Sequence, residues 1–570
     1  MNRTDLKETD LWTLYQNSIT YSRQMSAYAD TDKNWRMYNG NQWYGLKCIG
    51  IEPVQLNYIK SIVNFKVGRI NTNLWGVNYS SETVDNEQFR PLANKLCKMI
   101  NKYVNKIWEK EGMDYKIRMY SLIAAVDDES VFYTYWDKES KMPIVELLNK
   151  NDIYYGNENN PDIQSQPYII IKRRMPVINV QDMAMENGIP LDLIVGDNEN
   201  LEESGEKAKY EKDPMVTVLT KLYKEKGRVH YEIATRCAVI QKDNNLGLKN
   251  YPVTHFPWAP KPGSARGEGV VRNLTPNQIE LNKTLMRQML VTKKTAYPQR
   301  IVNVSRIVNP EDVEKIGATI RVKGETIGDI KQVFDTTQPV QLSFDLERLK
   351  SDLIQTTRDL EGASDIATGS VNPEDASGKA IVAVQDAANM PLTEQVTYLK
   401  RSLEELARIF FDMIVAYTEG KLKLEDEVLN EDTDQVEIRV IEVPTYVLEE
   451  LRLSAKIDIT PKSAYDKFAQ ERTYENLLEG GYFTAQRLPE LKVLAKVLDD
   501  DATINKQKLN DAIAEIERQQ RKIDEIQQRV QKKAIIAKQL IDDAEYNEQN
   551  LEDYNEPNLP ENETVDESPV

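Results

Sequence analysis

The sequence GEGVVRNLTPNQIELNKTLMRQMLVTKKTA, residues 267–296, marks the change from a β-rich region to a long helix. Thr275 is the expected N-cap and Pro276 the expected first helical residue, because a threonine hydroxyl caps a helix start and a proline needs no donor there. From residue 276 to residue 300, five basic residues accompany a single acid, Glu280. The 570-residue chain has a net charge of −18, so this helix is a basic exception.

The basic side chains of this helix have two interpretations. They form an ordinary solvated face, or they contact phosphate groups weakly and without sequence preference. Aromatic residues do not alternate with them, which disfavours binding of single-stranded nucleic acid by base stacking. The candidate residues on the helix are Lys283, Arg287, Lys293 and Lys294.

Helical and β-rich patterns alternate before this helix. Apolar residues at helical spacing predict helices near residues 53–70 and 89–108. Short apolar runs between residues 130 and 260 predict strands, interrupted by a charged surface loop at 196–213. The first 270 residues therefore combine helices with a β-rich part.

The pattern after the basic helix is helical again. A compact α/β segment, 297–340, leads to a second helix at 341–362. A long helix then begins near Gly378 and should kink at Pro391. We expect an α+β fold that is mainly α. The best apolar seam of the chain follows the kink, at Leu392, Val396, Leu399, Leu403, Leu406, Phe410, Met413 and Tyr417.

The sequence pattern from about residue 459 onward also predicts helices. Apolar residues recur every seven positions there, but intervening polar residues such as Gln519 weaken a coiled-coil interpretation. A one-sided helix packed on its neighbours is the favoured alternative. Residues 541–570 contain eleven acidic residues and no basic ones, so we expect an acidic, disordered tail. The heptad positions are Leu509, Ile516, Ile523, Val530 and Ala537.

Composition excludes several classes of protein. No apolar run approaches the ~18 residues that a membrane-spanning helix needs, and the N-terminus lacks the apolar core of a signal peptide. Cys48, Cys97 and Cys237 lie far apart, which favours free thiols in a reducing compartment.

The loop sequence DLEGASDIATGSVNPEDASGKAIVAVQDAANMP, residues 359–391, contains a Ser-Gly-Lys that resembles the end of a P-loop. A P-loop requires a glycine where Pro373 stands and Ser or Thr where Ala380 stands. No strand pattern precedes the loop either. The ATPase interpretation therefore fails.

Other catalytic patterns are weak. The two histidines, His230 and His255, are too few for histidine-based zinc sites or triads, and both read as structural. The run Asp127-Asp128-Glu129 could recruit a metal, but a solvated helix end is the favoured interpretation. We expect no enzyme, metal or cofactor. Two classes of protein stay open on these residues: a metal-dependent nucleic-acid enzyme with acidic ligands, and a helical scaffold protein.

Several of these stretches together resemble the portal proteins of tailed double-stranded DNA bacteriophages. WRMYNGNQW (35–43) resembles their N-terminal segment, and GEGVVRNLTPNQIELNKTLMRQML (267–290) resembles the entry into their first stem helix. DLEGASDIATGSVNPEDASGKAI (359–381) resembles the end of the second stem helix, the tunnel loop and the start of the next helix. ITPKSAYDKFAQERTYENLLEGGYFT (459–484) resembles the start of the crown. The resemblance covers roughly residues 34–498 and rests on the order of these segments.

The resemblance implies a closed ring, usually of twelve subunits, at one capsid vertex. The ring would be the conduit through which the terminase packages DNA and through which the DNA later leaves. It implies location in the virion, with assembly in the host cytoplasm and no membrane partner. The expected parts are a wing (1–270), two stem helices (271–296 and 341–362), a clip (297–340), a tunnel loop (363–378), a kinked helix returning to the wing (379–458), a helical crown (459–540) and the acidic tail (541–570).

The resemblance also implies contacts for particular residues. The stem residues above would line the channel, and the wing would meet capsid and scaffolding proteins. The tunnel loop would touch DNA transiently, although an ordinary solvent loop is the alternative. The clip would contact the large terminase subunit and later the head–tail adaptor. The implied residues are Asp365, Thr368, Asn372, Glu374 and Asp375 in the tunnel loop, and Arg321, Lys323, Glu325, Asp329 and Lys331 in the clip.

Overall fold

The computed structural model is 56% helical and divides into two compact units, Met1–Thr460 and Pro461–Val570. This composition agrees with the expected mixture of helix and sheet. The structure describes residues 7–25, 27–45, 52–80, 90–196, 214–296, 300–313, 315, 317–323, 334–336, 344–363, 390–418, 420–430, 435–450, 454–461, 477–484, 487–497 and 506–552.

The first unit begins with helices, as the apolar spacing predicted. Helix α3 starts where the Asn57 side chain accepts a hydrogen bond from the backbone N–H of Lys60 at 3.2 Å. In α4, which confirms the helix predicted near residues 89–108, Leu96, Ile100 and Val104 are buried, whereas the apolar Leu92 is exposed. The elements are α1 (Asp10–Gln24), α2 (Ala27–Asn39), α3 (Tyr58–Ile70), β1 (Asn73–Ser80), α4 (Arg90–Lys110) and α5 (Met113–Asp127).

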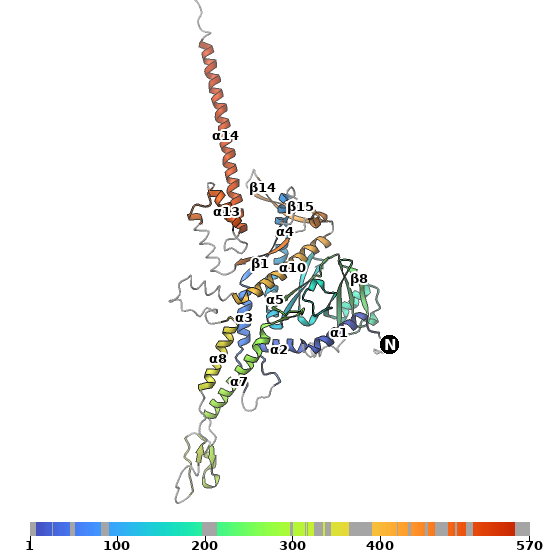
Figure 1. Ribbon diagram of the computed structural model, residues 1–570, viewed down its shortest axis with the longest axis vertical. Helices are drawn as coiled ribbons and strands as arrows, with labels where there is room; N and C mark the ends of the chain where they lie inside the picture. The colour runs from blue at the N-terminus through green and yellow to red at the C-terminus, as the bar shows by residue number, and fades with distance from the viewer. Residues whose placement is uncertain are drawn as a thin grey trace, which may run out of the picture. The chain divides into compact units, whose positions relative to one another are not determined.

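Two antiparallel sheets form the β-rich part (Figure 1). A three-stranded sheet has the order β3-β2-β9, and a five-stranded sheet has the order β4-β5-β6-β7-β8. Helix α6 (Val177–Glu186) packs against β5 and β6. The strands are β2 (Glu129–Asp137), β3 (Met142–Leu148), β4 (Ile153–Tyr155), β5 (Tyr168–Pro176), β6 (Met215–Glu225), β7 (Arg228–Ala234), β8 (Val239–Asn245) and β9 (Val253–Pro257).

Helix α10 (Thr393–Tyr417) runs through the main hydrophobic core and packs on β9 and β2. The predicted seam is confirmed, because Leu399, Leu403, Leu406 and Phe410 are fully buried. Pro391 does not kink this helix. It lies in the 3₁₀ turn Met390–Leu392 that precedes α10, where its missing N–H costs no helical hydrogen bond. The predicted helix start near Gly378 falls outside the described residues.

The basic helix α7 (Val270–Ala296) begins five residues before the predicted N-cap. Thr275 lies inside the helix, where its hydroxyl donates to the carbonyl of Val271 at 2.8 Å, and Pro276 is an interior proline. Tertiary contacts override the local signal, since the amide of Gly269, just before the helix, donates to the Asp128 carboxylate at 2.9 Å. The N-cap prediction was therefore wrong.

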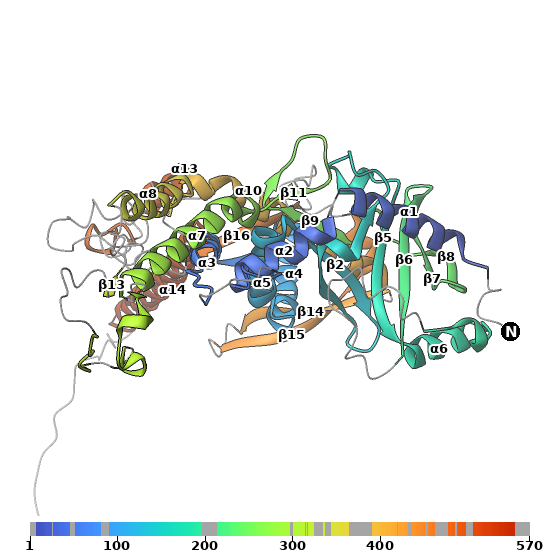
Figure 2. The same ribbon diagram turned by 90° about the horizontal axis from the view of Figure 1, so that it is seen from below.

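The remaining elements of the first unit are shorter. Helix α8 (Phe344–Leu360) pairs with α7, and the hairpin of β14 (Lys421–Asn430) and β15 (Gln435–Pro444) lies against α4 (Figure 2). Strand β16 (Ser454–Pro461) pairs with β1. The others are β10 (Ala259–Pro260) with β11 (Gly267–Glu268), β12 (Arg300–Val302) with β13 (Phe334–Thr336), and α11 (Thr445–Glu450).

The second unit contains α13 (Leu488–Val497) and the 47-residue α14 (Lys506–Glu552). Leu491, Leu509 and Ile513 form its small core, whereas Ile523 and Val530 are exposed. Among the residues of α14 whose side chains are described, packing on the neighbouring helix thus covers only those near its start. Residues 541–552 are helical, which corrects their assignment to a disordered tail, because extending a formed helix costs far less than starting one.

None of the helices in the described ranges is long and apolar enough to cross a membrane. Cys97 and Cys237 are free thiols, and Cys48 lies outside the described residues.

A glycine substitution tests how tightly α7 is attached. A Cβ at residue 269 would lie 2.9 Å from the backbone oxygen of Ala125 and 2.9 Å from the amide of Asp128. We expect Gly269→Ala to lower the free energy of unfolding by about 1–3 kcal/mol through overpacking, measured by urea denaturation. The matched control is Gly68→Ala in α3, where a Cβ meets no atom within 4 Å. This substitution should stabilise the protein slightly, because alanine favours the helix more than glycine does. Equal effects at both positions would contradict the tight attachment.

Candidate functional site

Helices α7 and α8 lie side by side and antiparallel, and α7 carries the four predicted basic residues (Figures 1 and 2). The first turns of α7 meet the last turns of α8, where the Asn277 side-chain amide donates to the hydroxyl of Thr357 at 3.2 Å. The described parts of segment 300–336 join the opposite ends of the two helices. The pair is thus held at one end and carries a small β-containing segment at the other.

Gln278 attaches this helix pair to α3. Its side-chain oxygen accepts hydrogen bonds from the backbone amides of Tyr58 at 3.0 Å and Ile59 at 3.3 Å. Its side-chain nitrogen donates to the carbonyl of Leu56 at 2.7 Å, so the buried amide is fully used. The hydroxyl of Tyr58 donates to the carbonyl of Ile354 in α8 at 2.9 Å. Three helices are therefore fixed at one polar junction.

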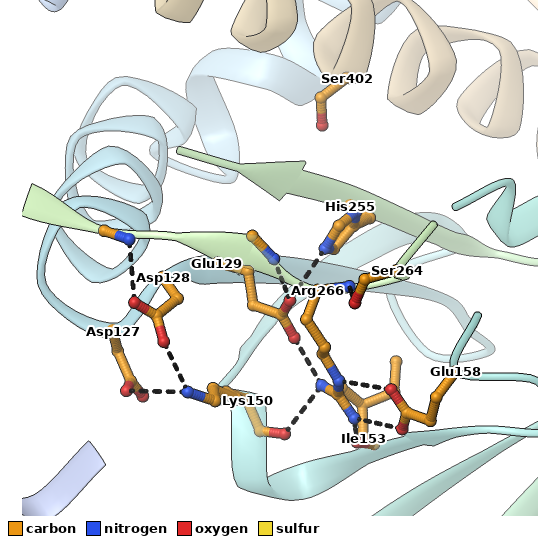
Figure 3. A network of polar contacts seen from close by, with 12 residues as sticks. Asp127, Asp128, Glu129, Lys150, Ile153, Glu158, His255, Ser264, Arg266 and Ser402 are labelled. Atoms are coloured by element: carbon orange, nitrogen blue, oxygen red, sulfur yellow. Dashed lines mark hydrogen bonds and ion pairs between the residues drawn. The ribbon is translucent and has the colours of Figure 1, made fainter. Parts of the chain in front are cut away.

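The start of α7 is held by two carboxylates that follow α5 (Figure 3). Asp128 accepts hydrogen bonds from the amide of Gly269 at 2.9 Å and from Lys150 at 2.8 Å. Glu129 accepts a hydrogen bond from the amide of Gly267 at 3.2 Å. These backbone contacts fix where the chain enters α7.

Arg266 completes this buried network (Figure 3). Its guanidinium forms ion pairs with Glu129 and with Glu158, the latter at 2.8 Å. His255 contacts Glu129 at 3.3 Å, which agrees with the structural role predicted for that histidine. The network joins β2, β9, the loop after β4 and the entry into α7.

The predicted solvated helix end at Asp127-Asp128-Glu129 was wrong, because all three residues are at most 2% exposed. The sequence contains acids at a helix end but does not reveal the distant cations, Lys150 and Arg266, that make their burial possible. Gln278 was also missed, although it falls between the buried Leu274 and Leu281 on α7. A polar residue between buried apolar positions is the signal that could have identified it.

Two acids of the network have opposite pKa shifts. Burial raises the pKa of Asp127 to about 7, against the attraction of Lys150, whose ammonium nitrogen lies 3.9 Å away. Burial also acts to raise the pKa of Glu129, but the Arg266 guanidinium, with help from His255, lowers it to about 2. Glu129 therefore stays ionised and paired, whereas Asp127 titrates near neutral pH.

The four predicted basic residues of α7 are all exposed. At about 100° per residue, Lys283, Arg287 and Lys294 share the face opposite the buried side of the helix, and Lys293 lies to one side. Lys283 and Arg287 both pair with Glu280, at 3.5 and 2.9 Å. The face is thus only moderately positive, which suits weak, reversible contact with phosphates.

Two of the five predicted clip residues are described. Arg321 and Lys323 are exposed, and their backbone amides donate to the side chain of Asn309 and the carbonyl of Arg306, both at 2.8 Å. These contacts leave the two cationic side chains on the surface. Glu325, Asp329 and Lys331 lie outside the described residues.

The predicted tunnel-loop residues Asp365, Thr368, Asn372, Glu374 and Asp375 also lie outside the described residues, but both ends of the loop are described. Gly362 has a φ of +68° after α8, and a Cβ there would lie 3.2 Å from the ring of Pro391. Ala363 and Leu392 are buried in the main core. The chain therefore leaves α8 and returns to α10 at one place.

Among the described residues, Glu225, His230 and Asp243 bring three possible metal ligands together. The Asp243 carboxylate already accepts a hydrogen bond from the hydroxyl of Tyr223 at 2.8 Å and lies 2.8 Å from His230 Nδ1. These contacts explain the arrangement without an ion.

The sequence can be compared with known protein families. The model of the phage P22-like portal protein family matches residues 132–554, roughly three quarters of the chain. The match includes both sheets, α7, α8 and α10, and it extends over α14. No curated protein matches the chain.

The pKa of Asp127 predicts a pH-dependent stability. Between its ordinary pKa of 3.8 and about 7, the folded protein holds a proton that the unfolded chain releases, so this contribution to stability falls as pH rises through that window. The Asp127→Asn variant has no carboxyl group that titrates at this position. Relative to the unaltered protein, we expect its free energy of unfolding to increase by about 3 kcal/mol between pH 5 and pH 8. Chemical denaturation at both pH values measures the difference. The control is Asp182→Asn, which changes an exposed carboxylate. If Asp127→Asn increased the free energy of unfolding no more than this control does, the raised pKa of Asp127 would be contradicted.

Proposed function

The chain belongs to the phage P22-like portal protein family, and from this membership we propose how its parts carry out the portal function. A portal protein is the head–tail connector of a bacteriophage and acts in packaging of its DNA. Membership implies a ring of subunits and a place in the virion capsid.

We propose that α7 and α8 are the two stem helices of a closed ring, usually of twelve copies. The observation that supports this most is the antiparallel pair itself, anchored by Gln278 and Asp128 at one end. Its 27-residue α7 is about 40 Å long, enough to form a channel wall. Ring closure requires each subunit to offer two different faces to its neighbours.

The proposed channel face carries Lys283, Arg287 and Lys294, with Lys293 beside it. A conduit must hold its DNA weakly, because each neutralised phosphate adds salt-sensitive affinity. Glu280 offsets part of the positive charge of this face through its two ion pairs. A moderately charged wall of this kind favours passage over tight binding.

The remaining parts are assigned by their place in the chain. Residues 297–340 are proposed as the clip, whose Arg321, Lys323, Glu325, Asp329 and Lys331 would contact the terminase and later the head–tail adaptor. The wing (1–270, with the return segment 379–458) would meet capsid and scaffolding proteins, and residues 459–540 would form the crown. Assembly would take place in the host cytoplasm.

No observation in the described part of the chain favours a metal-dependent nuclease. The acids on which that alternative depended are buried, and Asp128 and Glu129 are paired with Lys150 and Arg266. The portal family is a structural one, and we propose that this chain has no enzymatic activity of its own.

The tunnel loop provides the test of this proposal. The two loop ends meet at Gly362 and Pro391, so shortening the loop between them need not move α8 or α10. We expect deletion of residues 367–376 to reduce packaged or retained DNA at least tenfold while rings still form, because the loop would touch DNA at the narrowest point. Nuclease-protected DNA per particle measures this.

The matched control removes residues 201–210, an equal length from the charged insertion. This control should package normally. Normal packaging by the 367–376 deletion would contradict the proposed role of the loop.

A further inference from the structure

Helix α4 is as strongly basic as α7, although it lies in the N-terminal part of an acidic chain. It contains six basic residues and one acid, Glu109. Five of the basic residues are lysines spaced three or four positions apart, so they project from one face of the helix. These lysines are Lys95, Lys98, Lys102, Lys106 and Lys110.

A pocket of about 270 Å³ opens between this face, the turn joining β2 to β3, and strand β14. Helix α4 and β14 lie beside one another (Figure 1). The pocket has an apolar floor of Met99, Ile107 and Met142, all buried, with Tyr103 beside them. The charged lining residues are Lys102, Lys106, Lys110, Lys141, Lys423 and Glu425.

Glu425 shows that this pocket can hold a carboxylate. One oxygen of its side chain lies 2.7 Å from the ammonium nitrogen of Lys106 and 3.6 Å from that of Lys102. Hydrogen bonding from Lys106 lowers the pKa of Glu425, so its carboxylate is ionised at neutral pH. One carboxylate of the chain itself thus occupies part of the pocket.

The rest of the pocket keeps most of its positive charge, although Lys110 interacts electrostatically with the carboxylate of Asp137. Neither Lys110 nor Lys141 forms an ion pair with a described residue. Lys423 lies 4.0 Å from Glu442, a carboxylate that also pairs with Lys421. The lining as a whole has five lysines against one acid, a strong attraction for a second anionic group.

We propose that this pocket binds an acidic segment of a partner protein. Carboxylates of the segment would pair with Lys110 and Lys141, and an apolar side chain between them would pack on Met99 and Met142. A short segment that carries both acidic and apolar side chains therefore matches both the charge and the apolar floor of the pocket.

Duplex DNA fits the pocket less well. The pocket has the volume of a few side chains, and its apolar floor offers nothing to a sugar–phosphate backbone. The inference concerns a site on α4 and does not depend on the conduit function of α7 and α8.

The test uses the full chain and a fluorescein-labelled peptide, ELELE, with QLQLQ as the uncharged probe. We expect saturable binding of ELELE, one per chain, that weakens as salt increases, and no binding of QLQLQ. The double variant Lys110→Gln/Lys141→Gln should weaken binding about tenfold, measured by fluorescence anisotropy. Glu425→Gln should strengthen it about threefold, because it removes the carboxylate that pairs with Lys106.

Matched variants separate the pocket from general electrostatics. Lys95→Gln/Lys98→Gln removes the same charge from the same helix outside the pocket, and Glu109→Gln removes one acid there; both should leave binding within a factor of two. Equal weakening by the two lysine pairs would overturn the proposal, as would absence of saturable binding. Displacement of ELELE by a duplex oligonucleotide that binds more tightly and requires Lys110 and Lys141 would assign the pocket to DNA instead.

Discussion

The buried pairing of two carboxylates with the chain entering α7 is the constraint on which the rest of the first unit depends. Isolated, Asp128 and Glu129 would cost several kcal/mol each to bury, and their cations and backbone amides offset that cost. Because a Cβ at Gly269 has no room, the entry into α7 cannot shift without disturbing the end of α5 and the start of β2. Gln278 fixes the same helix again two turns later. A force on the α7–α8 pair would therefore be transmitted to α3, α5 and β2 through the contacts of Gly269 and Gln278.

Periodic features of this fold could be predicted from the sequence, and long-range ones could not. The spacing of apolar residues placed the seam of α10, and the charge pattern found an exposed basic face on α7. The N-cap at Thr275 was wrong because a hydrogen bond from Gly269 to a distant acid starts the helix earlier. The burial of the acids at residues 127–129 depends on ion pairs with Lys150 and Arg266. These two cations are distant in the sequence, and no local pattern links them to the acids. In α14, helix propagation continued past the point where the acidic composition suggested disorder.

The roles proposed for the two basic helices, α7 and α4, place different demands on their charge. On α7 the cationic side chains are exposed, and Glu280 offsets part of their charge, which suits a surface that DNA passes without being held. On α4 three of the lysines line a pocket with an apolar floor, which suits the proposed binding of a defined partner. The same residue type can thus provide weak contact on an open face and selective contact in a pocket. Neighbouring carboxylates and the concavity of the surface decide whether lysines make weak or selective contacts. Neither property can be derived from the composition of the sequence.

The mass and shape of the purified chain test the central claim most directly. Light scattering combined with electron microscopy of negatively stained particles should show a closed ring with a central channel wide enough for duplex DNA. Twelve copies of the 65.6 kDa chain give an expected mass of about 790 kDa. A compact monomer or dimer at every concentration, also after co-production with the other head proteins of the phage, would contradict assembly into a conduit.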